Sequence, residues 1–121
     1  MKVLVVDDNR AVLSTTVHFL KSHNLDAAGA EGGLQALSAC REASFDVVVT
    51  DLSMPDKDGF ELADDVRAIG GVSKLILITG LALTPQQDSL VRERFDEVLM
   101  KPFRLETLVD AIYASSQGVT S

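Results

Sequence analysis

The sequence of 121 residues has no tryptophan, a single cysteine and only 5% aromatic residues. Because aromatic side chains are scarce, the core must be built mostly from Val, Leu, Ile and Ala. The lone Cys40 excludes an internal disulfide, and its place in a helical pattern predicts an inert, partly buried thiol. No apolar run approaches the ~20 residues that span a bilayer, and no basic segment with an apolar signal region opens the chain. We therefore expect a cytoplasmic protein that makes no contact with the membrane.

Positive charge is also in short supply, since 11 Lys and Arg residues face 18 Asp and Glu residues and give a net charge of -7. Phosphate backbones repel an acidic surface, so we expect no direct binding of nucleic acid. The hydrophobic content of 46% and the charged content of 24% are typical of a soluble globular protein. The length suits one domain with a single core.

Short β-branched runs alternate with helical patterns along the chain, which is typical of a parallel sheet. The predicted strands cover residues 2–6, 26–30, 45–50, 74–79 and 97–100, and the predicted helices cover residues 10–22, 33–41, 60–68, 85–94 and 104–116. We expect the second strand to be a weak edge strand. We also expect the fourth helix to be the least firmly packed, because it has few large apolar residues.

Four of the predicted strands run directly into polar or charged residues. Asp7 and Asp8 follow the first strand, Asp51 the third, Thr79 ends the fourth, and Lys101 follows the fifth. In an open parallel sheet the carboxyl ends of the strands line one edge, where ligands bind. The sequence therefore predicts one site with three carboxylates, a hydroxyl and an ammonium group.

This set of groups suits a divalent cation and a phosphoryl group together. Three neighbouring carboxylates repel one another, so at least one pKa should rise unless a cation binds. Mg²⁺ takes one or two carboxylates, keeps several waters and coordinates phosphate oxygens. A carboxylate can also act as the nucleophile in phosphoryl transfer and form an acyl phosphate. The protein then has to supply little more than positioning and charge neutralisation.

The motifs, taken in order, resemble the receiver domain of bacterial two-component response regulators. The residues that carry the resemblance are Asp7-Asp8, Asp51, Met54-Pro55-Asp56-Lys57-Asp58-Gly59, Thr79 and Lys101-Pro102-Phe103. The resemblance covers about residues 2–115 and implies a flavodoxin-like (βα)5 doubly wound parallel sheet with strand order 2-1-3-4-5. We therefore expect a receiver domain over residues 1–115. The small polar residues 116–121 are expected to be a polar tail or the start of a linker.

The resemblance also implies roles for individual residues. Asp51 would be the phosphoacceptor, Lys101 would contact the phosphoryl group, and Thr79 would be the switch hydroxyl. Mg²⁺ would be the cofactor. The ligands implied for it are Asp8 and Asp51 directly, Asp7 through water, and the backbone carbonyl of Ser53. The family further implies a cis peptide bond between Lys101 and Pro102.

The sequence departs from the family pattern at three places. Val98 stands where a Tyr or Phe is usual, Gly80 follows the switch hydroxyl where Ala is common, and residues 94–96 lack the usual Gly-Ala pair. A valine is short and has few rotamers, so it cannot move as an aromatic switch residue does. We therefore expect phosphorylation to act mainly on residues 80–85 and on the fourth helix.

Receivers accept their phosphoryl group from a histidine kinase or a histidine phosphotransfer domain, so the resemblance implies such a partner. We expect it to dock on a mostly apolar patch beside the site. The residues of that patch are Ala11, Val12, Thr15, Pro102 and Phe103. No output domain is recognisable in the sequence. A stand-alone regulator, the receiver of a longer regulator and the receiver of a hybrid kinase are all open.

Two other functions compete with a phosphoryl-accepting signalling module. A Mg²⁺-dependent phosphohydrolase would use Asp51 as nucleophile, but such enzymes usually place a second acid two residues on, where this chain has Ser53. A receiver-like fold that only binds proteins is disfavoured, because every phosphorylation residue is present. We therefore expect a phosphoacceptor that dephosphorylates itself and is not a conventional enzyme.

Several other features have simpler interpretations. The charged residues at 56–58 and 64–65 are predicted to be solvated, and the glycine pairs at 32–33 and 70–71 to punctuate helices. His18 and His23 lie on or just after the first helix, so we expect surface or edge positions for both.

Overall fold

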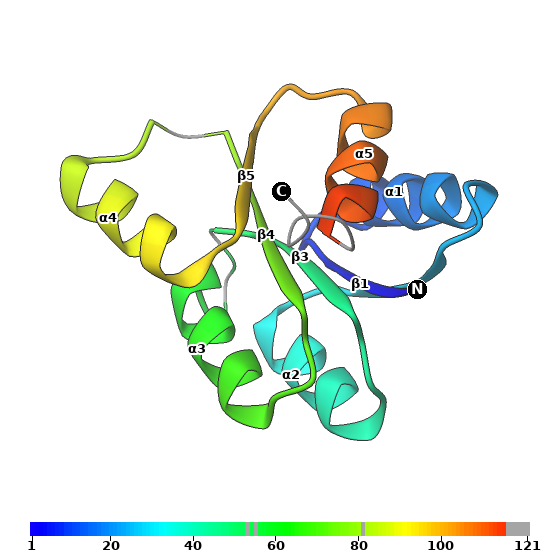
Figure 1. The fold of residues 1–121 in the computed structure, drawn as a ribbon, viewed down its shortest axis with the longest axis horizontal. Helices are drawn as coiled ribbons and strands as arrows, with labels where there is room; N and C mark the ends of the chain where they lie inside the picture. Colours follow the sequence, from blue (N-terminus) through cyan, green and yellow to red (C-terminus); the bar gives the residue numbers. More distant parts are fainter. Residues whose placement is uncertain (53, 55, 81, 116–121) are drawn as a thin grey trace.

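The computed structural model describes residues 1–52, 54, 56–80 and 82–115 and shows a five-stranded parallel sheet between two layers of helices (Figure 1). The sheet order is β2-β1-β3-β4-β5, and every neighbouring pair is parallel. The elements in chain order are β1 (Lys2–Val6), α1 (Arg10–Ser22), β2 (Asp26–Ala30), α2 (Gly33–Glu42), β3 (Val47–Asp51), α3 (Gly59–Ile69), β4 (Lys74–Thr79), α4 (Pro85–Arg94), β5 (Glu97–Met100) and α5 (Leu105–Ser115). The predicted flavodoxin-like (βα)5 doubly wound fold is confirmed.

The predicted element bounds are confirmed closely, with small corrections that have local causes. β3 begins at Val47, two residues later than predicted, because Asp46 bonds to Lys2 through both its side chain and its backbone instead of extending the ladder. α3 begins at Gly59 because Asp58 caps it, with Glu61 completing a capping box. α2 runs one residue further than predicted, and α5 starts at Leu105 rather than at residue 104.

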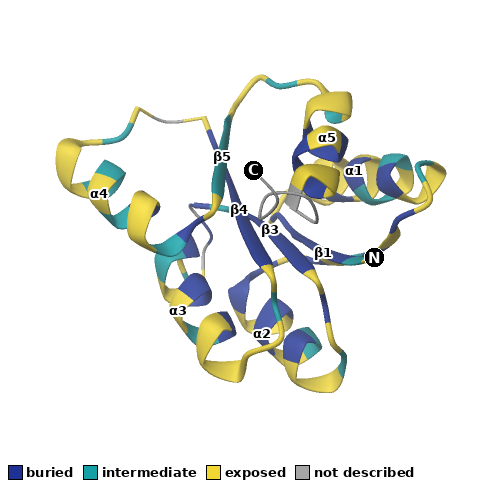
Figure 2. Cartoon of the chain, in the orientation of Figure 1, coloured by how far each residue is buried: buried dark blue, intermediate teal, exposed yellow. Residues whose placement is uncertain are grey.

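The sheet separates two apolar clusters. α2, α3 and α4 cover one face, and α1 and α5 cover the other (Figure 1). All six residues of β4 are buried, as expected for a strand covered on both sides (Figure 2). The cores are built mainly from Val, Leu, Ile and Ala, and Cys40 is a buried free thiol whose burial raises its pKa. The expectation of an inert structural cysteine agrees with this placement.

α4 differs from the other helices in how little of it is buried. Its start is well defined, because Thr84 and Gln87 form a capping box and Pro85 occupies the first helical position. Val91 is nevertheless its one buried residue, and all residues of α4 are described by the structure. Most of its surface is exposed in Figure 2. The prediction that this helix is the least firmly packed is confirmed.

None of the helices among the described residues is both long enough and apolar enough to cross a membrane.

Candidate functional site

The predicted acidic residues meet at the carboxyl edge of the sheet. β1 and β3 are in register from Val3 opposite Val47 to Val6 opposite Thr50, so the next residue along each strand direction, Asp7 and Asp51, lies at the same level of the sheet. The Asp7 N–H donates to the carbonyl of Ala30 at 3.1 Å, which fixes the backbone beyond β1. The sheet topology therefore places carboxylates from two neighbouring strands side by side.

Lys101 reaches across this edge to the carboxylate at the end of β3. Its Nζ donates to Asp51 Oδ2 at 3.0 Å, and both side chains are partly exposed. The Lys101 N–H donates to the carbonyl of Thr79 at 2.8 Å, which ties the chain beyond β5 to the end of β4. The Lys101-Pro102 peptide bond is cis, as the resemblance implied. The structure thus brings the ammonium, the carboxylate and the end of β4 together.

The electrostatics of Asp7 agree with a crowded acidic site. Burial raises the pKa of Asp7, and the negative charges of Asp51 and Asp8 raise it further. The N–H of Asn9, which donates to Asp7 Oδ1 at 2.9 Å, and the charge of Lys101 act in the opposite direction without cancelling the rise. The expected rise of at least one pKa is therefore present, but burial is its main cause and the neighbouring carboxylates add a smaller part.

The donor set suits a hard divalent cation, although it is not a ready-made cage. Asp8 is exposed and Asp51 is half-buried, so carboxylate oxygens can be reached from solvent. Among the residues that the structure describes, no three His, Cys, Asp or Glu side chains stand together as metal ligands. Mg²⁺ requires only one or two carboxylates and fills its other positions with water and phosphate oxygens. Ser53, whose carbonyl was predicted as a further ligand, lies outside the described residues.

The end of β4 carries the predicted hydroxyl and a glycine. Thr79 is buried at the last position of the strand. A Cβ added to Gly80 would lie 3.5 Å from the Cβ of Lys101, which is ordinary van der Waals contact. Packing therefore does not require glycine at this position. On the neighbouring strand Val98 is half-buried and Met100 is 52% exposed, so the described part of β5 offers no aromatic side chain.

The five residues predicted to form an apolar patch line a single groove. This groove has a volume of about 620 Å³ and lies between α1 and the chain after β5. Its lining consists of Ala11, Val12, Thr15, Thr16, Gly80, Lys101, Pro102, Phe103 and Leu105. Because Lys101 belongs both to the groove and to the acidic edge, the groove opens directly beside the carboxylates.

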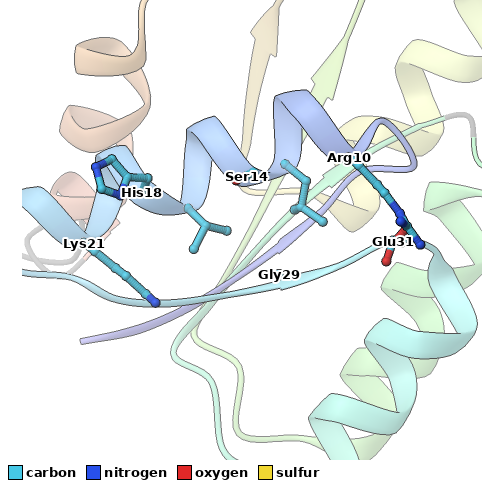
Figure 3. A pocket seen from close by; sticks show the side chains of 8 residues that line it. Arg10, Ser14, His18, Lys21, Gly29 and Glu31 are labelled. Carbon is cyan, nitrogen blue, oxygen red and sulfur yellow. The ribbon is translucent and has the colours of Figure 1, made fainter.

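A second groove, which the sequence did not suggest, lies between α1 and β2 (Figure 3). It has a volume of about 410 Å³ and is lined by Arg10, His18, Lys21 and five other residues, none of them from the acidic edge. Figure 3 shows Arg10 turned toward Glu31, and the Arg10 Nε lies 2.6 Å from Glu31 Oε1. Arg10, one of the three basic residues that line this groove, is therefore already paired with a carboxylate. As predicted, both histidines are on the surface side of α1, His18 exposed and His23 half-buried.

The charged residues at 56–58 and 64–65 are exposed or half-buried, as predicted, but they are not merely solvated. Each carboxylate or ammonium there has a specific partner, which exposure alone would not require. Lys57 Nζ lies 2.6 Å from Asp65 Oδ2, Arg94 Nε lies 2.9 Å from Asp64 Oδ1, and Asp58 caps α3. Asp56 accepts two hydrogen bonds from the first turn of α2. Of these contacts, only the capping box of α3 could be expected from nearby residues, because Asp58 is followed three residues later by Glu61.

The chain matches the family model described as the response regulator receiver domain over residues 3–113. It is 31% identical over 109 residues to a response regulator receiver protein of Anaeromyxobacter sp. (strain Fw109-5), covering 90% of this chain and 46% of that protein. It is also 31% identical over 119 residues to the sensor histidine kinase RcsC of Salmonella typhimurium, covering 94% of this chain and 12% of the kinase. The chain therefore spans less than half the length of either relative.

Solved structures show the same architecture. The receiver domain of Francisella response regulator 1452 superposes with a TM-score of 0.85 at 26% identity and covers 98% of each chain. The similarity in fold therefore extends over nearly all of the sequence.

Proposed function

The chain belongs to the response regulator receiver domain family, and we propose that Asp51 is the carboxylate on which this member accepts a phosphoryl group. Receivers are signalling modules of two-component systems, so the alternative of a phosphohydrolase is not supported. The observation that carries the choice of Asp51 is its position at the end of β3, paired with Lys101 at 3.0 Å and beside Asp7. Asp51 thus lies next to both the Lys101 ammonium and the carboxylate of Asp7.

The chain's own residues supply the parts that phosphoryl transfer requires. A carboxylate oxygen of Asp51 attacks the phosphorus of a phosphohistidine donor, the P–N bond breaks, and the imidazole takes up a proton while an acyl phosphate forms. The Lys101 ammonium, which is paired with the Asp51 carboxylate, offsets negative charge on the phosphoryl oxygens. The Thr79 hydroxyl donates to one of those oxygens. Little further chemistry is needed, since the transition state is loose.

Asp8 and Asp51 are the carboxylates proposed to hold Mg²⁺, with Asp7 acting through water and Ser53 through its carbonyl, as the family resemblance implies. The exposure of Asp8 supports a direct role, because its oxygens are open to solvent. Asp7 is buried, and its Oδ1 already accepts from the Asn9 N–H, which suits an indirect role. When bound, Mg²⁺ offsets the negative charge of the carboxylates and of the phosphoryl oxygens.

The phosphodonor, a histidine kinase or a histidine phosphotransfer domain, is proposed to dock in the groove between α1 and the chain after β5. Val12, 42% exposed, lies in that groove, and Ile69, 40% exposed, lies outside it at the end of α3. Val12→Glu should slow transfer from the kinase and spare labelling by acetyl phosphate, whereas Ile69→Glu should affect neither. Equal slowing of both kinds of labelling by Val12→Glu would show that the groove is not a docking site.

Residues 1–115 are proposed to form the receiver unit, with residues 116–121 as a tail or the start of a linker. The family match over residues 3–113 supports this division. The output, whether a separate partner or a further domain, is expected to respond to the phosphorylated state. Slow self-dephosphorylation is expected to end the signal.

The test of Asp51 uses a small phosphodonor, so that no kinase is needed. The protein is incubated with acetyl phosphate and Mg²⁺ and analysed by intact mass. We expect one phosphoryl adduct on the wild type and none on Asp51→Asn, because an amide is a poor nucleophile. A stable adduct on Asp51→Asn would falsify the assignment.

A further inference from the structure

The first turn of α2 has no capping side chain of its own. Gly32 occupies the cap position, so the chain provides no local acceptor for the free N–H groups that follow. The carboxylate of Asp56, from the loop between β3 and α3, fills this role. Its Oδ1 accepts from the Gly33 N–H at 3.0 Å, and its Oδ2 accepts from the Leu34 N–H at 3.2 Å. The hydrogen bonds from Leu34 and Gly33 lower the pKa of Asp56.

The glycine pair at the start of α2 makes room for this contact. A Cβ added to Gly32 would lie 2.9 Å from both carboxylate oxygens of Asp56. A Cβ added to Gly33 would lie 2.6 Å from the Cβ of Lys57. Real Cβ atoms do not approach other atoms so closely, so glycine is what allows the loop to lie against the helix. The missing cap and the incoming carboxylate therefore form one complementary contact.

The loop that Asp56 belongs to leads from the proposed phosphoacceptor to α3. At its other end the Gly59 N–H donates to the Leu52 carbonyl at 2.8 Å, and a Cβ on Gly59 would lie 2.8 Å from the Asp51 carbonyl oxygen. Met54 is buried in the core between these points. Asp56 adds a tether from the middle of the loop to a different helix.

We propose that Asp56 is a positioning residue for the acidic site, because it caps α2 from a distance and thereby fixes the loop that leaves Asp51. The inference rests on the proposed function of Asp51. Asp56 does not touch the reacting carboxylate, since both its oxygens face the N–H groups of α2. Its effect is on placement, and misplacement of about 1 Å can slow a reaction by roughly a hundredfold.

Two variants separate positioning from simple helix capping. Asp56→Ala removes both the cap and the tether. Adding Gly32→Ser to it supplies a cap within α2 itself, where serine is a favoured residue. The space is available, because the atoms nearest a Cβ at Gly32 all belong to the Asp56 carboxylate that the first change removes. Asp26→Ala, at an exposed residue at the start of β2, is the control for loss of one negative charge.

Labelling by acetyl phosphate with Mg²⁺ and the melting temperature are measured for each protein. Asp56→Ala should lower both, with labelling slowed on the order of tenfold. The double variant should recover the melting temperature but remain slow to label, and Asp26→Ala should resemble the wild type. Recovery of both properties in the double variant would overturn the proposal and leave Asp56 as a cap alone. An unchanged labelling rate in Asp56→Ala would overturn it as well.

Amide exchange provides a readout that does not depend on phosphorylation. Residues 56–59 should exchange faster than in the wild type in both Asp56→Ala and the double variant, while α2 is protected again in the double variant. If the double variant protects residues 56–59 as the wild type does, the tether is refuted. A wild type that acetyl phosphate does not label would refute the role of Asp51 instead, and the exchange result would still decide the tether.

Discussion

The loops that follow β3 and β4 both border the acidic site, yet they are held in very different ways. In the described part of the loop after β3, Met54 is buried in the core, Asp56 accepts hydrogen bonds from α2, and the Gly59 N–H donates to the Leu52 carbonyl. The loop leads into α3, whose buried residues include Leu62, Ala63 and Val66. The loop after β4 leads into α4, whose one buried residue is Val91. Figure 2 shows this contrast as a largely exposed α4 beside a partly buried α3.

α4 is attached mainly at its C-terminal end. Phe95 is buried just beyond the helix, Arg94 pairs with Asp64 at 2.9 Å, and Arg67 donates to the Arg94 carbonyl at 3.1 Å. At the other end, Ala82 and Thr84 are exposed, and only the half-buried Leu83 between them packs against the core among the described residues that precede the helix. We expect a shift of Thr79 toward a phosphoryl group to be passed to the N-terminal end of α4, because the described residues of the loop after β3 would lose more contacts by moving. Gly80 gives the connecting backbone freedom to accommodate that shift.

The contrast in packing should be largest in a matched pair of leucine truncations. Leu62→Ala on α3 removes a fully buried side chain and should cost about 3 kcal/mol, within the ~2–5 kcal/mol usual for such changes. Leu90→Ala on α4 removes a half-buried one and should cost about 1 kcal/mol or less. Urea unfolding of both variants measures the difference. Equal costs would mean that α4 is packed as firmly as α3.

A second matched pair of variants tests whether the start of α3 or the start of α4 positions the residues that accept the phosphoryl group. Asp58→Ala and Thr84→Ala each remove the capping side chain of a capping box, and each should cost about 1 kcal/mol. Asp58 lies in the loop after Asp51, so its loss should also slow labelling by acetyl phosphate. Thr84→Ala should leave labelling nearly unchanged and instead raise amide exchange in α4. The reverse pattern of labelling would place the positioning elements on the β4 side.

A smaller effect is expected from the raised pKa of Asp7. The folded protein holds this proton more tightly than the unfolded chain does, so stability is lost as the pH rises above the ordinary aspartate value of 3.8. Without Mg²⁺, Asp7→Asn should therefore raise the melting temperature at about pH 7 and give no gain at about pH 3. Asp8→Asn, at the adjacent exposed position, should gain less. A gain for Asp7→Asn that persists at low pH would point to packing rather than charge.

The sequence predicted the features that local pattern controls. Apolar runs ending in Asp7, Asp51 and Thr79 defined the strands and the edge at which they meet, and the helix predicted at 85–94 has the same bounds as α4. The order of the strands came from the family resemblance, and the structure confirms it.

The contacts that the sequence did not predict join residues far apart in the chain. The sequence predicted a solvated charge at Asp56, because nothing near it in the sequence requires a carboxylate. Its hydrogen-bond donors, the N–H groups of Leu34 and Gly33, lie 22 and 23 positions earlier. The sequence predicted only that Gly32 and Gly33 mark a helix boundary. The side chains for which they leave space, Asp56 and Lys57, come from another loop.

We expect phosphorylation at Asp51 to act on the loop after β4 and on α4, and not on the tethered loop after β3. Hydrogen exchange with Mg²⁺, with and without beryllofluoride as a phosphoryl mimic, tests it most directly, and Asp51→Asn serves as the unresponsive control. Protection should change at Gly80 and in residues 82–94, while residues 56–69 stay nearly constant. No change in residues 82–94, together with the largest change in α2 or α3, would contradict the account.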